Sequence, residues 1–339
     1  MDSRERVLKA LDLKKPDRVP VIPFVISFAA KYAGVKFFDY CRDPRRLAEA
    51  QIVTARRFGI EAVYVDSDPV IEIEAMGAEV KYYDDEIPTA SRPTVASSSD
   101  IRSLRVPDIE RDGRLPVWLE AIRILKERVG HDLAVFANIN GPFQAAAQLR
   151  GISQICMDFY RDPGIATELV RFTTNTIIAF AKAEIEAGVD AIVLGDAMSS
   201  PNLISPKQFE EFSFPYIRRV VAEAGASFPF FLHICGNSTP IIDKMVRTGA
   251  RFLEVDAQVD LADIRKKYGN SIGIRGNVSP SLLLMGQPHE VEGTCRIAIE
   301  AAASDGGFIL GSGCELPKNT PYDNLETMVR AAEKFGKYG

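Results

Sequence analysis

The chain is poor in the residues that disulfide frameworks and metal sites use, with five cysteines and three histidines among 339 residues. An odd number of irregularly spaced cysteines does not suggest a disulfide framework. No stretch approaches the about 18–20 uninterrupted apolar residues of a membrane helix, and the segment 1–20 lacks the apolar core of a secretory signal. The formal charge of −5 leaves no broad basic surface for phosphates. We therefore expect a cytoplasmic protein with reduced thiols that binds neither nucleic acid nor a membrane.

Short runs rich in Val, Ile or Phe alternate with longer helical patterns along the whole chain. This alternation is typical of a parallel α/β fold, and eight strands close a TIM barrel. A doubly wound open sheet would require a glycine-rich phosphate turn after its first strand, and the sequence there has none. We predict a single-domain (β/α)8 TIM barrel over residues 1–339. The predicted strands are 18–25, 62–68, 133–141, 191–197, 229–236, 252–257, 271–278 and 308–314.

One connection of the predicted barrel is too long for a single crossover, because about 65 residues separate the second strand from the third. Residues 79–93 read as a small β excursion, and a polar loop and the helical pattern 115–129 follow it. We therefore predict a small β excursion and a helical insertion between strands two and three. No linker and no internal repeat divides the chain.

Polar or metal-binding side chains stand at the carboxyl ends of most predicted strands. In a TIM barrel these ends meet at one mouth, where the chemistry takes place. Packing alone would favour branched apolar side chains at such positions, so we expect a functional site there. The strand-end residues are Asp66, Asp68, Asn138, Asn140, Asp196, His233, Cys235, Asp256, Asn277 and Cys314.

A histidine and two cysteines form the most specific pattern. His233 and Cys235 are two residues apart on one strand and so share a face. Cys314 closes the last strand at the same mouth. Zinc takes imidazole and thiolate ligands, and a catalytic zinc keeps one position open. The pattern favours a zinc site, with Asp256 as a fourth ligand or a partner for His233; the alternative is a satisfied core histidine with two buried thiols.

The remaining candidates have ordinary structural explanations beside their functional ones. Asp196 could act in catalysis or bind the metal, but a helix cap is at least as good an explanation. Asn277 could donate a hydrogen bond to a cofactor, but asparagine also suits turns. We expect structural or surface roles for His131, His289, Cys41, Cys156 and Cys295.

Several segments resemble the uroporphyrinogen decarboxylase superfamily, and together they cover nearly the whole chain. They are RERVLKALDLKKPDRVPV near the N-terminus, LHICGNSTPIIDKMVRTGARFLEVD and GNVSPSLLLMGQP further on, and FILGSGCELPKNTPYDNLETMV near the C-terminus. Within the superfamily, H-x-C followed by a distant cysteine in GSGC is similar to the corrinoid-dependent, methylcobamide:coenzyme M type methyltransferases. The resemblance implies that His233, Cys235 and Cys314 hold a zinc that binds a thiol substrate as thiolate.

The decarboxylase itself is the rival within the superfamily. Its essential aspartate would fall on Asp68, which makes Asp68 a candidate catalytic residue. The family's N-terminal arginines, which bind the propionates of the tetrapyrrole, have no counterpart here, because no arginine stands between Val19 and Cys41. A cysteine also replaces the family's late histidine. Asp68 is then either a shared structural position or a residue that faces the corrinoid or substrate.

The sequence predicts a zinc-dependent methyltransferase that moves a methyl group between a corrinoid and a thiol acceptor such as coenzyme M. The chain has no corrinoid-binding module that we recognise, so we expect a separate corrinoid carrier protein to bring methylcobalamin. One alternative is methyl transfer from a methoxy or methylamine donor to cob(I)alamin, with zinc as a Lewis acid. Tetrapyrrole decarboxylation and a non-catalytic metal-binding barrel are further alternatives. The sequence is compatible with a homodimer but does not determine the oligomeric state.

Overall fold

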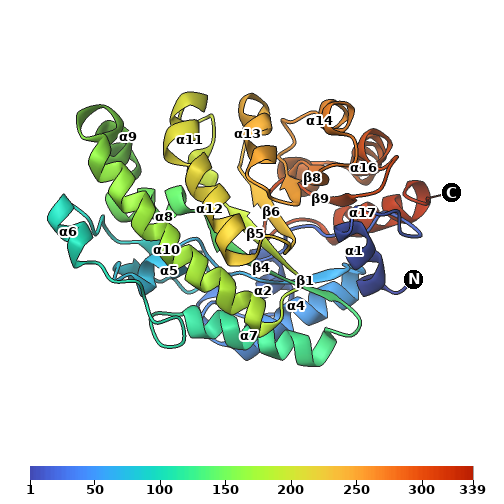
Figure 1. The fold of residues 1–339 in the computed structure, drawn as a ribbon. Coiled ribbons are helices and arrows are strands. Elements are labelled where there is room, and N and C mark those ends of the chain that lie inside the picture. The colour runs from blue at the N-terminus through green and yellow to red at the C-terminus, as the bar shows by residue number, and fades with distance from the viewer. Residues whose placement is uncertain (339) are drawn as a thin grey trace.

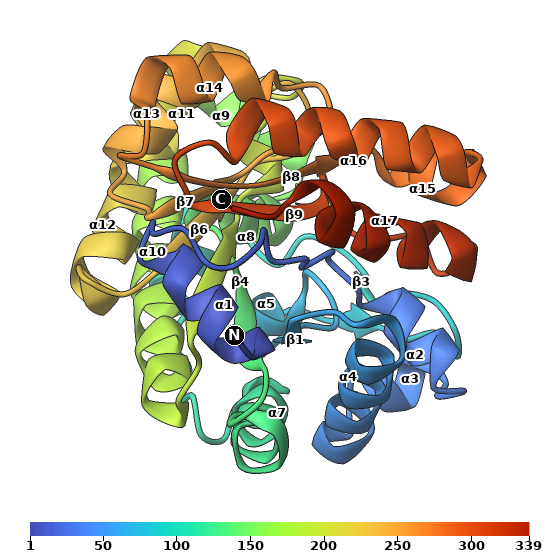
Figure 2. The same cartoon turned by 90° about the vertical axis from the view of Figure 1, so that its right-hand side faces the viewer.

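A computed structural model describes residues 1–338 of the chain. Its main sheet has seven strands, every neighbouring pair is parallel, and the sheet curls into a barrel with helices outside (Figures 1 and 2). The strand order follows the sequence, as expected for successive β/α units. In sheet order, the strands are β1 (Ala62–Val65), β4 (Ala134–Asn140), β5 (Ala191–Gly195), β6 (Phe230–His233), β7 (Phe252–Glu254), β8 (Gly273–Val278) and β9 (Phe308–Ser312).

The segment 18–25 bridges the gap between the first and last strands of this sheet. Val21 pairs in parallel with Leu310 of β9, and its carbonyl accepts a hydrogen bond of 3.1 Å from the Glu61 N–H, directly before β1. The two prolines of the segment lack an N–H and cannot complete a regular ladder. The prediction of a regular first strand is therefore wrong, although the segment occupies that strand's place in the barrel.

Helices cover the outside of the barrel (Figure 2). Sequence signals delimit them: α4, for example, begins after Asp43, whose side chain accepts from the Arg45 N–H at 2.9 Å, and ends at Gly59 with φ of 71°. Among residues 1–338, no helix is long and apolar enough to span a bilayer. The helices of this outer layer include α4 (Pro44–Phe58), α7 (Leu115–Val129), α10 (Pro163–Ala187), α12 (Phe214–Gly225), α13 (Ile242–Arg247), α14 (Leu261–Tyr268), α16 (Pro288–Ala302) and α17 (Tyr322–Phe335).

Shorter elements occupy the connections and the two ends of the barrel. The predicted β excursion is present as an antiparallel pair, β2 (Val80–Lys81) and β3 (Thr89–Ala90), and α6 and α7 follow it. The remaining helical elements are α1 (Ser3–Leu11), α2 (Ser27–Tyr32), α3 (Phe37–Tyr40), α5 (Ile71–Ala75), α6 (Ser98–Ser103), α8 (Pro142–Arg150), α9 (Ile152–Arg161), η1 (Ala197–Ser199), α11 (Pro206–Phe212), η2 (Thr239–Ile241) and α15 (Pro280–Met285).

Aromatic side chains and one arginine fill the inside of the barrel. The rings of Phe231 and Phe252 stack with centroids 4.4 Å apart, and Phe136 lies 5.4 Å from Phe231. The Arg275 guanidinium is fully buried and lies over the Tyr64 ring at 5.3 Å. These residues make the interior a packed core, so small molecules reach the strand ends only from the mouth.

Candidate metal centre at the barrel mouth

His233, Cys235 and Cys314 meet at the mouth of the barrel. His233 ends β6, Cys235 follows it by two residues, and Cys314 follows β9 by two. His233 Nε2 lies 3.1 Å from Cys235 Sγ, the two sulfurs are 4.0 Å apart, and the three ligand atoms all lie within 4.8 Å of one another. Two thiolates bound at about 2.3 Å to a tetrahedral zinc are about 3.8 Å apart. The spacing of the donor atoms therefore fits a zinc ion.

The turn after Cys235 is held by backbone contacts. Gly236 adopts a φ of 76°, and a Cβ there would lie 2.5 Å from the Asn202 side chain. Ser200 Oγ donates to the Cys235 carbonyl at 2.8 Å, and the Gly236 N–H donates to Asp256 Oδ2 at 2.9 Å. Asp256 thus supports the turn that carries Cys235. Asp256 is not part of the group of donors that lie within 4.8 Å of one another, and its role as a fourth ligand or a partner for His233 stays a prediction.

Glu254 lies directly beside the His233 ring. His233 Nδ1 lies 3.3 Å from the Glu254 carbonyl oxygen and 3.4 Å from Glu254 Oε1, which leaves Nε2 facing the thiols. Burial lowers the pKa of His233, but the charges of Glu254 and Cys314 outweigh it and raise that pKa to about 9. Burial raises the pKa of Glu254 itself to about 7. Strand alternation could have identified Glu254, because it shares a face with Asp256.

The two thiols differ in acidity. A hydrogen bond from the Cys235 thiol lowers the pKa of Cys314, and the charge of His233 adds to the effect. The same hydrogen bond raises the pKa of Cys235, with burial as the second cause. The two sulfurs therefore share a hydrogen bond with one more acidic and one less acidic thiol, and zinc, which binds cysteine as thiolate, would displace the proton between them.

A cavity of about 230 Å³ lies beside the three donor residues. Carboxylates also line it. Asp66 accepts from Asn138 Nδ2 at 2.6 Å, and Glu315 accepts from Ser27 Oγ at 2.7 Å. Glu315 was absent from the sequence prediction, although it directly follows Cys314. The ionisable residues of the lining are Asp66, Asp68, His233, Cys235, Glu254, Cys314 and Glu315.

Asp68 lines this cavity, but its carboxylate is engaged by an arginine. Arg114 Nη1 and Nη2 donate to the two carboxylate oxygens at 2.6 and 2.9 Å, and Ser67 Oγ donates at 2.6 Å. Both Asp68 and Arg114 are buried. Arg114 comes from the insertion before α7, and no local sequence pattern marked it. The contacts favour the structural explanation of Asp68 over a catalytic one.

Two other predicted site residues lie outside the cavity lining. Asp196 is fully buried and accepts from the Gln144 N–H at 2.8 Å and Ser213 Oγ at 3.3 Å. It therefore caps the first turn of α8, and burial raises its pKa to about 6. Asn277 Nδ2 donates to the Val259 carbonyl at 2.8 Å. These contacts favour the structural explanations of Asp196 and Asn277, and their catalytic and cofactor-binding roles stay predictions.

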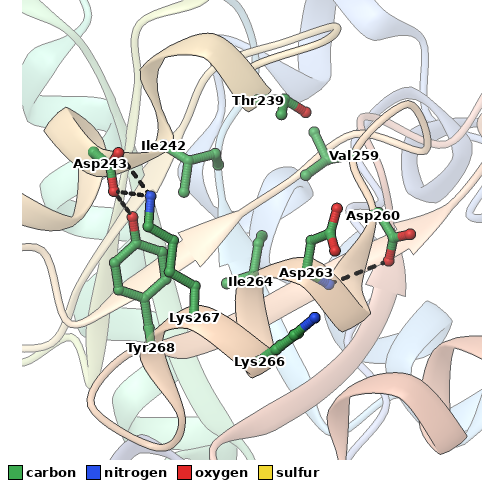
Figure 3. Close-up of a pocket in the computed structure, with 10 residues that line it drawn as sticks. All are labelled: Thr239, Ile242, Asp243, Val259, Asp260, Asp263, Ile264, Lys266, Lys267 and Tyr268. Atoms are coloured by element: carbon green, nitrogen blue, oxygen red, sulfur yellow. Dashed lines mark hydrogen bonds and ion pairs between the residues drawn. The ribbon is translucent and has the colours of Figure 1, made fainter.

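A second, larger cavity lies on the outer surface between α13 and α14 (Figure 3). Its volume is about 460 Å³. Figure 3 shows Asp243 in contact with Lys267 and Tyr268 at one edge, and the Lys267–Asp243 pair measures 2.6 Å. The groove contains none of the predicted site residues, so we place the chemistry in the smaller cavity at the mouth.

The fold and the site together define a parallel α/β barrel protein with an imidazole and two thiols gathered at its carboxyl-terminal mouth. The family model of uroporphyrinogen decarboxylase (URO-D) matches residues 2–335, and the chain belongs to this family. The match covers the barrel from α1 to α17.

Proteins similar to this chain include methyltransferases of Methanosarcina species. A methylcobamide:CoM methyltransferase, MtbA, from Methanosarcina mazei is 29% identical over 98% of both chains. The corresponding MtaA from Methanosarcina barkeri is 28% identical over 98% of both chains. The solved structure of a methyltransferase from Methanosarcina mazei superposes with a TM-score of 0.91, at 27% identity and 99% coverage of both chains. The predicted resemblance to this branch of the family is confirmed.

Proposed function

We propose that this protein transfers a methyl group between a corrinoid and a small thiol, with a zinc ion held by His233, Cys235 and Cys314. Zinc bound to these donors lowers the pKa of a coordinated thiol, which supplies a thiolate nucleophile at neutral pH. The convergence of two sulfurs and one imidazole nitrogen within 4.8 Å carries the proposal. The methyl-transfer activities in the names of the similar proteins support it.

The residues around the donors have positioning roles in this proposal. The Glu254 carbonyl and carboxylate orient the His233 ring, so that Nε2 faces the thiols. Asp256 and Ser200 fix the turn that carries Cys235. The cavity beside the donors, at about 230 Å³, is below the about 300–1,000 Å³ of pockets for drug-sized ligands. It accommodates a small thiol and leaves the bulk of a corrinoid outside.

A corrinoid must therefore present its methyl group from above the mouth. We propose that a separate carrier protein delivers it, because the sheet and helices of residues 1–338 are used to build the barrel and its connections. A cytoplasmic location and the state of assembly stay predictions.

Tetrapyrrole decarboxylation fits the cavity less well. A substrate with several carboxylates requires cationic partners, whereas the ionisable lining residues other than His233 are carboxylates and thiols. The buried arginines that contact lining residues, Arg114 and Arg275, already bind Asp68 and Glu254. These contacts disfavour an acidic tetrapyrrole at this site.

Single-turnover demethylation of methylcobalamin tests the proposal. Protein purified without chelator should contain about one zinc per chain, and methylcobalamin should lose its methyl group only when zinc and a thiol are both present. Methylation of cob(I)alamin from a methoxy or methylamine donor without any thiol would instead support the Lewis-acid alternative. Zinc binding without either reaction would support a non-catalytic metal-binding barrel.

A further inference from the structure

The charges that face the thiol cavity are not balanced. Four carboxylates line it, from Asp66, Asp68, Glu254 and Glu315, and the lining contains no lysine or arginine among residues 1–338. Bound zinc would not change this balance, because two cysteine thiolates neutralise its double positive charge. The carboxylates therefore determine the electrostatic potential that a substrate meets.

Two of these carboxylates have cationic partners and two have only neutral ones. Arg114 binds Asp68, and Arg275 contacts Glu254 from the barrel interior. Asp66 has the Asn138 amide as its side-chain donor. Glu315 receives its hydrogen bonds from Ser27, with the backbone N–H at 3.0 Å and Oγ at 2.7 Å. Asp66 and Glu315 are thus the uncompensated pair.

Asp66 and Glu315 line the same cavity, and no lysine or arginine of residues 1–338 lies in that lining to compensate them. Two ionised carboxylates that share a site without a cation repel each other. A cation placed in the cavity would relieve this repulsion, whereas a second anion would increase it.

We propose that the thiol accepted at this site carries a cationic group, in contrast to the sulfonate of coenzyme M. The inference rests on the proposed function, since it concerns the substrate of the same cavity. The thiol sulfur faces His233, Cys235 and Cys314, and the cationic end of the molecule faces Asp66 and Glu315. The carboxylates stabilise the bound cation by charge and disfavour a bound sulfonate by the same interaction.

Three thiols of equal heavy-atom count test this directly: thiocholine, 3,3-dimethylbutane-1-thiol and coenzyme M. Each has a two-carbon spacer and a tetrahedral end group, which is cationic, neutral or anionic, and the quaternary ammonium of thiocholine cannot coordinate zinc. We expect titration calorimetry on zinc-loaded protein to show thiocholine binding at least about tenfold more tightly than coenzyme M. The neutral thiol should lie between them. Zinc-free protein provides the reference heat.

Variants of the two carboxylates identify the cause of the preference. Asp66→Asn and Glu315→Gln should each reduce the ratio of the dissociation constant of coenzyme M to that of thiocholine, while the zinc content stays unchanged. Asp243→Asn, in the outer groove of Figure 3, serves as the matched control and should leave the ratio as it is. Zinc content and thermal melting confirm that each variant is folded.

The outcomes separate this inference from the proposed function. Tighter or equal binding of coenzyme M would overturn the inference and leave thiol activation by zinc standing. If none of the three thiols binds zinc-loaded protein, both proposals are wrong. A preference for thiocholine that persists in both variants would also overturn the inference, because its cause would lie elsewhere.

Discussion

A buried carboxylate stands at each end of strand β1, and the two carboxylates have different hydrogen-bond partners. Glu61 stands directly before the strand, at the floor of the barrel, and Asp66 stands directly after it, at the mouth. Both are buried, at 1% and 3% exposure. Glu61 receives hydrogen bonds from the guanidinium groups of Arg6 and Arg18 and, at 2.8 Å, from the Val21 N–H. Asp66 has one neutral amide donor.

The different pairing of these two carboxylates suggests that residues at the floor of the barrel stabilise the fold and residues at the mouth carry out its function. At the floor, a paired carboxylate joins α1, the segment 18–25 and β1, so its charge is fully used in holding the barrel together. At the mouth, incompletely paired groups remain available to a metal or substrate. A substitution at the floor should therefore affect folding, and one at the mouth should affect binding and turnover. The predictions below test that division.

Cys314→Ser should have the largest effect, and the effect should be on function. The serine hydroxyl is a poor zinc ligand, so we expect zinc content to fall strongly and methyl transfer to fall more than about 100-fold. The free energy of unfolding of the zinc-free forms should change little, because a barrel of this size has an ample core. Metal analysis and denaturant titration measure both quantities. Cys156→Ser is the control, and full zinc retention in Cys314→Ser would remove Cys314 from the site.

Glu61→Ala should have the largest effect on stability. It removes the acceptor of Arg6 Nη1, Arg18 Nη1 and the Val21 N–H, although Arg6 keeps its bonds to Asp17. The loss of one acceptor for three donors should cost about 3–5 kcal/mol in the free energy of unfolding. Zinc content should stay unchanged in the fraction that folds. Glu223→Ala removes an exposed pair with Arg219 and should cost less than about 1 kcal/mol in urea titrations. An equally small loss for Glu61→Ala would contradict the role that we assign to the floor.

Arg114→Met tests whether Asp68 contributes to stability or to function. Loss of the bidentate partner leaves a buried carboxylate unpaired, and we expect the free energy of unfolding to fall by about 2–4 kcal/mol. Zinc affinity should stay within about threefold of the wild-type value, since neither residue touches the donor atoms. Arg105→Met, in an exposed pair with Asp112, is the control. A large loss of methyl transfer with unchanged stability would make Asp68 a functional residue after all.

Glu184→Gln should give the smallest effect and should stabilise the protein. Glu184 on α10 is fully buried, and its carboxylate oxygens have no hydrogen-bond partner among residues 1–338. Burial raises its pKa well above 4.5, with the charge of Glu72 as the next cause. The folded state therefore favours the protonated acid, and stability is lost as the pH rises above the ordinary glutamate pKa. We expect the variant to gain about 1–2 kcal/mol at pH 7.

The pH dependence identifies the cause of that gain. The difference in unfolding free energy between Glu184→Gln and the wild type should be near zero below pH 4.5 and should grow toward neutral pH. Glu186→Gln, at an exposed position of the same helix, should show no such growth. A difference that is constant with pH would mean that the glutamate charge is not its source.

Much of the fold was predictable from local pattern. Alternating apolar runs indicated the seven regular strands and the β excursion, because strands and helices differ in hydrophobic period. The first strand was predicted as regular, and its prolines prevent this. Closure of the barrel at that point depends on contacts of Val21 with Leu310 and Glu61, and both residues are far from Val21 in the sequence.

The candidate site was predictable where the residue types are scarce. Histidine and cysteine are rare in this chain, so a His-x-Cys pattern with a distant cysteine at a strand end was informative. Carboxylates and asparagines are common at loops, and Asp196 and Asn277 turned out to hold neighbouring backbone in place. Arg114 was missed because its contact with Asp68 spans 46 positions and begins in an insertion.

X-ray absorption at the zinc edge tests the central claim most directly. We predict a zinc shell of two sulfurs and one imidazole nitrogen, completed by a light atom, in protein purified without chelator. Adding the accepted thiol should introduce one further Zn–S distance near about 2.3 Å and release about one proton. A shell without sulfur, or a sulfur count that no thiol changes, would contradict the account.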